Sequence, residues 1–315
     1  MRAVRIHEWG AAPSLDEVAP PAPGPGDTLV RVEAAAVGHL DLTVASGRFD
    51  IRPELPYVGG VEGCGTVVSS DVYQPGTRVT MRGGGLGLRR AGTWAELVAT
   101  RTRSLVPVPE GLPPEVGATY VMPTTTAYCA LHDIGRLGAW PVDGVRSAAD
   151  EVVVVAGAAG AVGSMVAQLA VRAGSTVLGL AGPGRPLPPG VEPVDPAELA
   201  RDRTATLLVD TLGGPELAAR SRWVRPGGRA VAVGYVAGTD LGLHLPNWLL
   251  DDVALLPVNM MRRDAAVREN LPMLAGLLLR GELTLRVKSF GLADAARALD
   301  LLAGGGLHGR AVLVP

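Results

Sequence analysis

Three glycines stand at three-residue spacing between an apolar run and a helix-like segment: Gly157, Gly160 and Gly163. Such a turn binds a pyrophosphate because the first glycine allows a tight bend, the second lets the phosphates approach, and the third lets helix and strand pack closely. The N-terminus of the following helix adds free N–H groups and the positive end of its dipole. The sequence therefore predicts a dinucleotide site that contains Gly157, Ala158, Ala159, Gly160, Ala161, Val162 and Gly163.

The segment after the next apolar run is expected to select the cofactor. NAD-preferring sites carry an acidic residue there, which holds the ribose hydroxyls. This chain instead has Gly182 and Arg185 within the run AGPGRP, without Asp or Glu. A guanidinium can pair with a 2′-phosphate, so we predict that Gly182 and Arg185 help to bind NADPH. The alternative is that Arg185 is an ordinary surface residue of a proline-rich loop and does not bind the cofactor.

A second group of polar residues could move a proton: His39, Asp41, Thr43 and Tyr57 form the candidate catalytic set. Histidine changes protonation near neutral pH, so we interpret His39 as a proton donor. The alternative is an ordinary hydrogen-bonding residue that faces a cofactor ribose or a neighbouring loop. Asp41 is expected to cap the helix that follows it, because aspartate is among the most favoured N-cap residues.

The elements that position these residues follow two different sequence patterns. Up to about residue 120, short runs rich in Val and Thr alternate with Gly and Pro clusters, which is typical of a partly open barrel or sandwich. Beyond it, long apolar runs alternate with helix-like segments, which indicates a doubly wound parallel sheet covered on both faces. The last run, GRAVLVP, needs a neighbouring sheet, and we expect it to return to the first domain.

Composition excludes several classes of protein. The 315 residues include 29 Lys plus Arg against 31 Asp plus Glu, so no net charge attracts nucleic acid or an anionic membrane. The two cysteines, Cys64 and Cys129, are expected to be free thiols in a reducing compartment. The N-terminus lacks the apolar core of a signal peptide and no window reaches the length of a membrane span, so we expect a cytoplasmic protein.

Several motifs together resemble the medium-chain dehydrogenase/reductase superfamily. They are LPYVGGVEGCGTVV, GTWAELVAT, MPTTTAYCAL, GAAGAVG, VDTLGG, RPGGRAVAVG and FGLADAARALDLLAGGGLHGRAVLV. The resemblance implies an α/β protein with a GroES-like β-barrel domain, residues 1–120 and 265–315, and an inserted Rossmann domain, residues 121–264. It places Thr126 beside a nicotinamide ring, and the alternative is that Thr126 caps the start of a helix. Gly234, Tyr235 and Asn259 complete the predicted cofactor-binding set.

The positions that hold catalytic zinc in part of this superfamily carry other residues here. The metal-binding cysteine is replaced by Gly38, the histidine by Val61, and the later cysteine falls near Met122. Glycine has no side chain and valine no lone pair, so the sequence predicts no metal site. The chain therefore resembles the zinc-independent branch, the quinone oxidoreductase-like enzymes and enoyl reductases. That branch often has Asn at position 38 and Tyr near Thr43, and neither is present.

The expected function is an NADPH-dependent, zinc-free reductase of a C=C bond conjugated to a carbonyl, in an enone, a quinone or an unsaturated acyl group. Two alternatives are a quinone oxidoreductase that reduces the quinone itself and an NADPH-binding sensor or structural protein with little turnover. The expected partner is a small apolar carbonyl compound, with neither nucleic acid nor membrane. The runs RAVAVGYVAG and VALLPVNMM leave an apolar sheet edge, and members of the superfamily commonly pair there, so we expect a homodimer.

Overall fold

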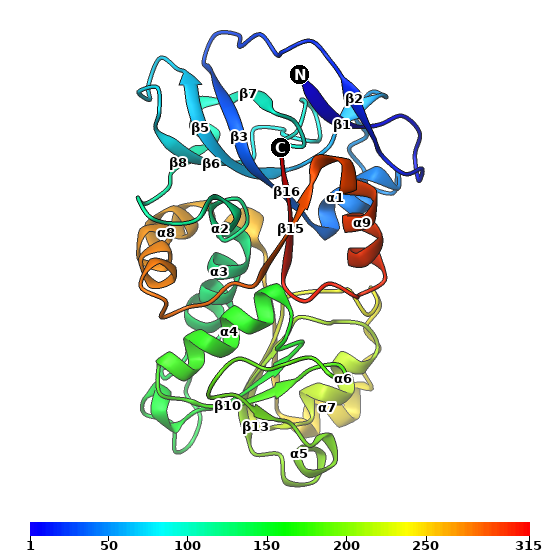
Figure 1. The fold of residues 1–315 in the computed structure, drawn as a ribbon. Coiled ribbons are helices and arrows are strands. Elements are labelled where there is room, and N and C mark those ends of the chain that lie inside the picture. The colour runs from blue at the N-terminus through cyan, green and yellow to red at the C-terminus, as the bar shows by residue number, and fades with distance from the viewer. The chain divides into compact units, whose positions relative to one another are not determined.

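The computed structural model describes the backbone of residues 1–315 and all side chains except those of residues 264–266. The chain forms two compact units (Figure 1). Unit 1 comprises Met1–Val121 and Leu285–Pro315, and unit 2 comprises Met122–Thr284. Residues 265–284, which the sequence analysis assigns to the first domain, thus fold with unit 2. Gln168 explains the difference, because its side chain exchanges hydrogen bonds with the backbone of Thr284 over 3.1 and 2.7 Å.

A seven-stranded sheet forms the main layer of unit 1, in the order β15-β16-β3-β5-β6-β8, with β7 paired to β3. Its strands are β3 (Asp27–Val37), β5 (Glu62–Ser69), β6 (Arg78–Arg82), β7 (Leu97–Arg101), β8 (Leu105–Pro107), β15 (Val287–Gly291) and β16 (Arg310–Val314). Strands β3, β5, β6, β7 and β8 lie in the Val- and Thr-rich part of the chain where strands were predicted. Most side chains of β3, β5 and β16 are buried. In the pairing of the described strands the sheet stays open between β15 and β8.

The C-terminal strand β16 returns to unit 1, as predicted. It pairs antiparallel with the end of β3, where Ala311 lies opposite Val37. A smaller sheet, in the order β2-β1-β4, contains β1 (Arg2–Ile6), β2 (Ser14–Glu17) and β4 (Tyr57–Val58). The helices of this unit are α1 (His39–Ala45), α2 (Pro114–Gly117) and α9 (Ala295–Ala303), with the 3-10 turns η1 (Thr102–Ser104) and η5 (Leu292–Asp294).

The core of unit 1 lies between these sheets. Trp94 is fully buried in it, and its indole N–H donates to the carbonyl of Ala36 over 2.9 Å. Its ring occupies the space where Gly59 would carry a Cβ atom, so glycine is required there. Cys64 and Cys129 are both buried free thiols, as predicted.

Unit 2 contains a six-stranded sheet in which all pairs are parallel, in the order β11-β10-β9-β12-β13-β14. Its strands are β9 (Val152–Ala156), β10 (Thr176–Leu180), β11 (Glu192–Pro193), β12 (Ala205–Asp210), β13 (Val224–Ala232) and β14 (Ala254–Pro257). Numbered along the chain, this is the doubly wound order 3-2-1-4-5-6. The fold class predicted from the sequence is confirmed. The order reverses between β9 and β12, and ligands of such sheets bind at the carboxyl ends of the strands at that point.

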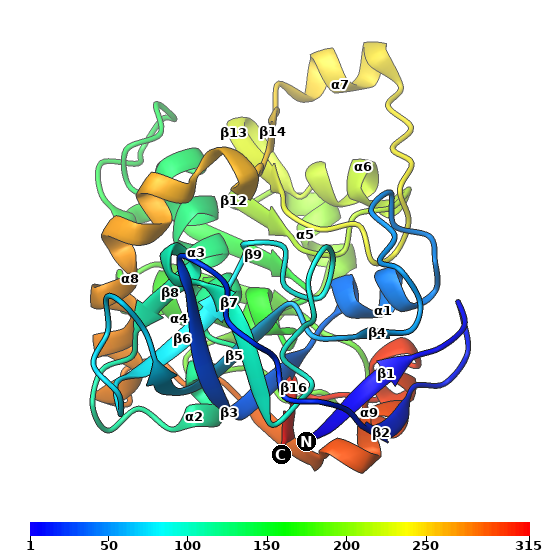
Figure 2. The same ribbon diagram turned by 90° about the horizontal axis from the view of Figure 1, so that it is seen from above.

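Helices flank this parallel sheet, with α4 on one side and α6 on the other (Figures 1 and 2). The helices that lie wholly or almost wholly in unit 2 are α3 (Val121–Tyr128), α4 (Ala161–Arg172), α5 (Pro196–Asp202), α6 (Glu216–Ser221), α7 (Leu245–Asp251) and α8 (Asp264–Leu279), with the π-helix η2 (Cys129–Ile134) and the 3-10 turns η3 (Ala148–Asp150) and η4 (Met260–Arg262). Among the residues described, none of these helices is both long and apolar enough to cross a membrane.

A buried ion pair fixes the amino ends of the central strands. Arg229 of β13 and Glu151 before β9 are almost completely buried and share two hydrogen bonds of 2.7 Å. Arg229 also donates to the carbonyl of Gly135 over 2.7 Å. This polar contact is fully satisfied, so it holds the end of the sheet opposite to the one where a ligand is expected.

Candidate active site

Helix α1 begins at His39, three residues earlier than predicted, and Gly38 is its N-cap. Asp41 is therefore not the N-cap, and that prediction was wrong. Its carboxylate, in the third helical position, accepts the N–H of Gly38 over 2.8 Å and the N–H of Val61 over 3.0 Å. An acidic residue at this position commonly reaches back to the N-cap in this way. Asp41 thus joins the start of α1 to the loop before β5.

Asp41 and Glu62 form a buried acidic pair in unit 1, with exposed fractions of 4% and 6%. Arg310 of β16 compensates it, because its guanidinium lies 3.1 Å from Glu62 and also donates to Thr119. Arg82 lies 3.1 Å from the other oxygen of Glu62. Burial raises the pKa of Asp41 to about 7, against the two backbone hydrogen bonds and with a contribution from Glu62. Burial also raises the pKa of Glu62, while Arg310 and Arg82 oppose the shift.

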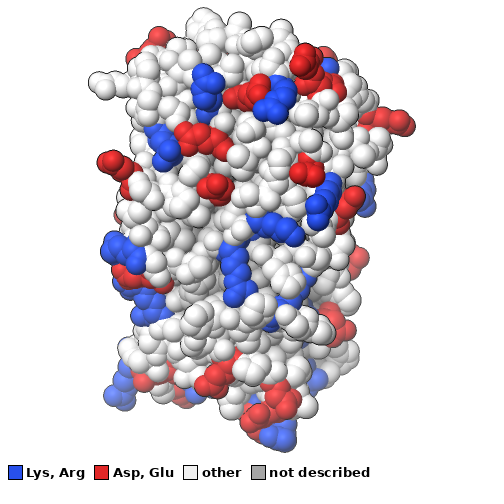
Figure 3. Space-filling view, in the orientation of Figure 1, with Lys and Arg blue, Asp and Glu red and all other residues white. Residues whose placement is uncertain are grey.

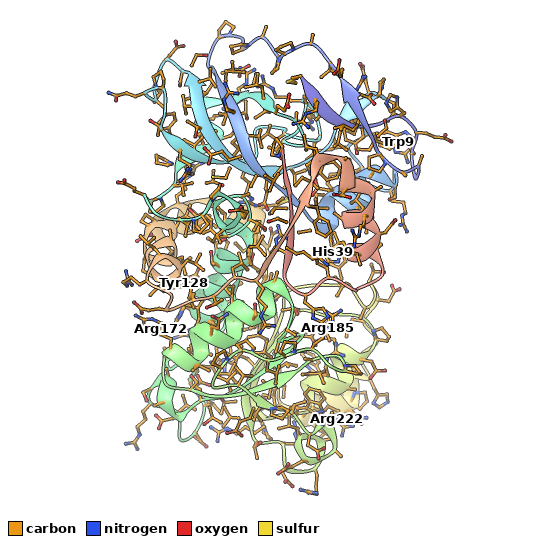
Figure 4. All side chains as sticks on the ribbon, in the orientation of Figure 1. Trp9, His39, Tyr128, Arg172, Arg185 and Arg222 are labelled. Carbon is orange, nitrogen blue, oxygen red and sulfur yellow. The ribbon has the colours of Figure 1, made fainter. Side chains whose placement is uncertain are left out.

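His39 starts α1 and is exposed beside this buried cluster (Figure 4). Partial desolvation, and then the positive charge of Arg310, lower the pKa of His39 below its ordinary value. The imidazole is therefore neutral at pH 7, with one ring nitrogen as donor and the other as acceptor.

The other two predicted catalytic residues have different surroundings. Thr43 donates its hydroxyl hydrogen to the carbonyl of His39 over 2.8 Å, within the helix. Tyr57 is 8% exposed in β4, and burial followed by the negative charge of Asp41 raises its pKa. Asp41 is thus close enough to Tyr57 for its charge to affect the pKa of that phenol, while the hydroxyl of Thr43 is bound within α1.

The donor set of this region does not fit a zinc ion. A Cβ atom at Gly38 would lie 3.5 Å from a guanidinium nitrogen of Arg310, so a cation already fills the space beside that position. Val61 contributes only its backbone N–H, to Asp41. Among the side chains that the structure describes, no three His, Cys, Asp or Glu residues are grouped so as to hold a metal. This region therefore does not supply the ligands that a catalytic zinc ion needs.

In unit 2 the glycine turn follows β9 directly. Gly157 has a φ of +83°, which favours glycine, and a Cβ atom there would overlap the hydroxyl of Thr211. Gly160 is the N-cap of α4, and a Cβ atom at Gly163 would overlap the carbonyl oxygen of Gly157. Ala158, Ala159, Ala161 and Val162 complete the turn and the first turn of α4. Side chains at these glycines would overlap neighbouring atoms, so the backbone of the turn stays open to a ligand. Such a turn fits the pyrophosphate of a dinucleotide.

The loop after β10 holds Gly182 and Arg185 (Figure 4). The backbone N–H of Arg185 donates to the carbonyl of Gly182 over 3.1 Å, so the two form a turn. The Arg185 side chain is half-buried and passes over Gly182. No acidic residue occurs between Ala181 and Val191.

The remaining predicted cofactor-binding residues lie at three separate places. Thr126 of α3 is 5% exposed, and its hydroxyl is a buried polar atom without a hydrogen-bond partner, which fits contact with a bound amide or ribose. Gly234 follows β13, and a Cβ atom there would overlap the carbonyl of Thr211. Tyr235 is 74% exposed. Asn259 accepts the N–H of Met261 over 3.1 Å and caps η4.

Sequence reasoning missed an ion pair in each of the two units. In unit 1 the pair is Glu62 and Arg310, which lie 248 positions apart. In unit 2 it is Asp210 and Arg220, whose side chains are joined over 2.6 Å. A signal existed only for Asp210, which ends an apolar run and precedes a Gly-Gly pair within VDTLGG.

Two family models match the chain. Residues 24–110 match the alcohol dehydrogenase GroES-like domain, and residues 192–313 match the zinc-binding dehydrogenase model. A quinone oxidoreductase of Mus musculus is 26% identical over 100% of this chain and 98% of its own length. A prostaglandin reductase-3 of Bos taurus is 29% identical over 89% of this chain and 77% of its own length.

The chain belongs to the medium-chain dehydrogenase/reductase family. The resemblance inferred from the sequence motifs is confirmed, and the protein is an oxidoreductase of this family. A solved quinone oxidoreductase from Pseudomonas syringae superposes with a TM-score of 0.81 over 100% of this chain and 99% of its own, at 22% identity, which shows the common fold. The words zinc-binding belong to the description of the family model. In this medium-chain dehydrogenase/reductase, Gly38 and Val61 have no side-chain atom that could bind the metal.

Proposed function

We propose that this medium-chain dehydrogenase/reductase is an NADPH-dependent, zinc-free reductase of a carbon–carbon double bond conjugated to a carbonyl group. The observation that carries the proposal is the glycine turn after β9, at the reversal point of the sheet, combined with an arginine and no carboxylate in the loop after β10. The relatives named quinone oxidoreductase and prostaglandin reductase support reduction of an activated double bond or quinone.

The residues of unit 2 bind and orient the cofactor in this proposal. Backbone N–H groups of the turn and of α4 face the pyrophosphate, Arg185 pairs with the 2′-phosphate, and Thr126 offers its unpartnered hydroxyl to the nicotinamide end. A bound nicotinamide supplies a hydride, which a conjugated acceptor takes at its β-carbon.

The residues of unit 1 act on the acceptor. Negative charge develops on the carbonyl oxygen during hydride transfer, and a hydrogen-bond donor placed there stabilises it. His39 serves as that donor, through the N–H of its neutral ring at pH 7 and as a stronger acid when protonated. Asp41 orients the start of α1 through Gly38 and Val61. An isolated ketone would need stronger polarisation than this group provides, which favours a conjugated substrate.

Arg185 provides the test of the cofactor assignment. The wild type is expected to bind NADPH at least tenfold more tightly than NADH, because a charge-assisted pair contributes about 1.5 kcal/mol or more. Arg185→Ala should remove this preference by weakening NADPH alone, in fluorescence titrations with both cofactors. Arg201→Ala is the matched control, because Arg201 is an exposed arginine of the same unit, paired with Asp202. Equal dissociation constants for NADPH and NADH in the wild type would refute the role of Arg185.

A second candidate function is reduction of a quinone to its hydroquinone, which the mouse quinone oxidoreductase favours because it spans the whole chain. Oxidation of NADPH by a panel of enones and quinones separates the two. Consumption with enones supports the proposal, consumption with quinones alone supports the second candidate, and tight NADPH binding without consumption indicates a binding protein.

We also propose that the protein forms a homodimer through β14. This strand lies at the end of the parallel sheet, with its outer backbone groups facing away from β13. Leu249, Leu250 and Met261 flank it with exposed fractions of 65%, 82% and 95%. An open sheet edge beside apolar side chains is a surface that proteins normally cover.

A further inference from the structure

The loops that follow β9 and β12 flank the point where the strand order of the parallel sheet reverses. The loop after β9 is the glycine turn, and the loop after β12 comprises residues 211–214. Because β9 and β12 are hydrogen-bonded neighbours, Asp210 at the end of β12 lies opposite Ala156 at the end of β9. The two loops therefore leave the same edge of the sheet side by side.

Thr211 locks the two loops together. Its backbone N–H and its hydroxyl both donate to the carbonyl of Ala156, over 3.1 and 2.7 Å. The same hydroxyl fills the space beside Gly157 where any other residue would place its Cβ atom. On its other side, the carbonyl of Thr211 fills the corresponding space at Gly234. The position of Thr211 thus sets how the first glycine of the turn is held.

A buried ion pair holds the loop that carries Thr211. One oxygen of Asp210, which is fully buried, accepts the N–H groups of Leu212 and Gly213, both over 2.8 Å. The other oxygen accepts the Nε hydrogen of Arg220 over 2.6 Å. Arg220, 7% exposed on α6, also donates to the carbonyl of Gly213 over 2.8 Å. Gly213 is therefore hydrogen-bonded at both its N–H and its carbonyl. Its φ of +67° is one that glycine adopts readily.

We infer that Asp210 and Arg220 are positioning residues for the dinucleotide, acting through Thr211 on the glycine turn. The inference rests on the proposed function in taking this turn as the pyrophosphate site. Loss of the Arg220 guanidinium removes the Arg220 hydrogen bonds to one oxygen of the Asp210 carboxylate and to the Gly213 carbonyl, both of which are buried. The loop must then rearrange, Thr211 moves away from Gly157, and the turn loses its support.

The test uses Arg220→Met and Arg220→Lys in the full-length protein. The lysine variant keeps a cation opposite Asp210 but cannot also reach the Gly213 carbonyl in the same geometry. Arg203→Met is the matched control. Arg203 precedes the same strand, β12, at its amino end, and pairs with Asp251 over 2.9 Å. Thermal unfolding of all variants identifies those that are folded and equally stable.

Two measurements are made on each folded variant: NADPH affinity by fluorescence titration, and amide hydrogen exchange of the ligand-free protein. We expect Arg220→Met to weaken NADPH binding by about tenfold or more, as for a buried polar group left unpaired, and Arg220→Lys to weaken it less. Exchange should accelerate at residues 211–214 and also at residues 157–160 in Arg220→Met, but at neither segment in Arg203→Met.

Three outcomes would overturn the inference: unchanged NADPH affinity in Arg220→Met, an equal loss of affinity in Arg203→Met, or faster exchange confined to residues 211–214. If the wild type binds neither NADPH nor NADH, the proposed function fails. In that case the exchange at residues 157–160 still decides whether the ion pair supports the turn, because that measurement needs no ligand. If Arg220→Met does not fold, the same comparisons are made with Arg220→Lys.

Discussion

At the scale of single residues, the surroundings of His39 change its expected role. The pKa of this side chain lies below its ordinary value of 6.5, because of partial desolvation and the charge of Arg310. An imidazolium that acts as proton donor would therefore be formed only in mildly acidic solution. At pH 7 the neutral ring can still donate a hydrogen bond to the oxygen of the substrate, and this is the role assigned to it here.

Replacement of His39 tests this role. His39→Ala is expected to lower kcat by about 10²-fold or more, the usual contribution of a hydrogen-bond donor to a developing oxyanion, with the dissociation constant for NADPH retained. In the wild type, kcat should rise as pH falls below 6.5, through the lowered pKa of His39, and this rise should be absent in the variant. His7→Ala is the control, since His7 is an exposed histidine of the same unit bound to Asp16 over 2.7 Å. Full activity of His39→Ala, or a rise centred above pH 6.5, would contradict the assignment.

Asp41 gives a prediction about stability and pH. Its pKa is about 7 in the folded protein and about 3.9 in an unfolded chain. Between these values the folded state binds more protons than the unfolded state, so this group makes the protein less stable as pH rises from 4 to 7. The effect is about 1.4 kcal/mol for each pKa unit of difference.

Asp41→Asn is uncharged at every pH and keeps one oxygen that can accept from Gly38 or Val61. The free energy of unfolding of this variant, relative to the wild type, is therefore expected to increase between pH 4.5 and pH 7.5. Urea denaturation at the two pH values measures it, with the exposed Asp50→Asn as control. A relative stability of Asp41→Asn that stays constant or decreases over this range would show that Asp41 is charged throughout.

At the scale of secondary-structure elements, the glycine turn between β9 and α4 is the part of the site that sequence predicts best. Its requirements are local: a buried strand, three glycines at fixed spacing and a helix, all within residues 152–172. The start of α1 was predicted less well, because Asp41 is held by Val61, a residue 20 positions away. A capping residue chosen from its neighbours alone does not reveal such a contact.

Gly163→Ala tests the packing of α4 on the turn. The added methyl group would overlap the carbonyl oxygen of Gly157, so backbone must shift, at a cost of about 1–3 kcal/mol for an overpacked site. Thermal unfolding should show a lower Tm, and NADPH titration a weaker affinity. Gly242→Ala is the control, because a Cβ atom there meets nothing within 4 Å. A Gly163→Ala protein as stable and as tightly binding as the control would show that the turn does not need glycine at this position.

At the scale of the whole molecule, the alternation of strands and helices predicted the fold class, and the apolar C-terminal run predicted the return of β16 to β3. The passage back to unit 1 was placed at residue 265, whereas it occurs at Leu285. The contacts that hold the intervening segment, such as that between Arg172 and Glu282 over 3.0 Å, join residues 110 positions apart. The pairing of Glu62 with Arg310 escapes sequence reasoning for the same reason, since charged residues carry no signal of a distant partner.

The proposed dimer is tested by adding a charge to the apolar surface beside β14. Leu250, 82% exposed, should tolerate Glu in a monomer, whereas in a dimer the buried charge would separate the subunits. Sedimentation velocity should show twice the chain mass for the wild type and a single chain for Leu250→Glu. Val72→Glu, at a residue 70% exposed in unit 1, should remain dimeric. A wild type that sediments as a single chain would refute the dimer.

The proposed reaction of this chain uses NADPH, without zinc, to reduce a double bond conjugated to a carbonyl. The reaction of the purified protein is measured with an enone and with NADPH that carries deuterium at both C4 positions of the nicotinamide, before and after treatment with a metal chelator. We expect product that carries deuterium at its β-carbon, in amounts equal to the NADPH oxidised and unchanged by the chelator. Deuterium at the carbonyl carbon, or turnover that a chelator abolishes and zinc restores, would contradict it.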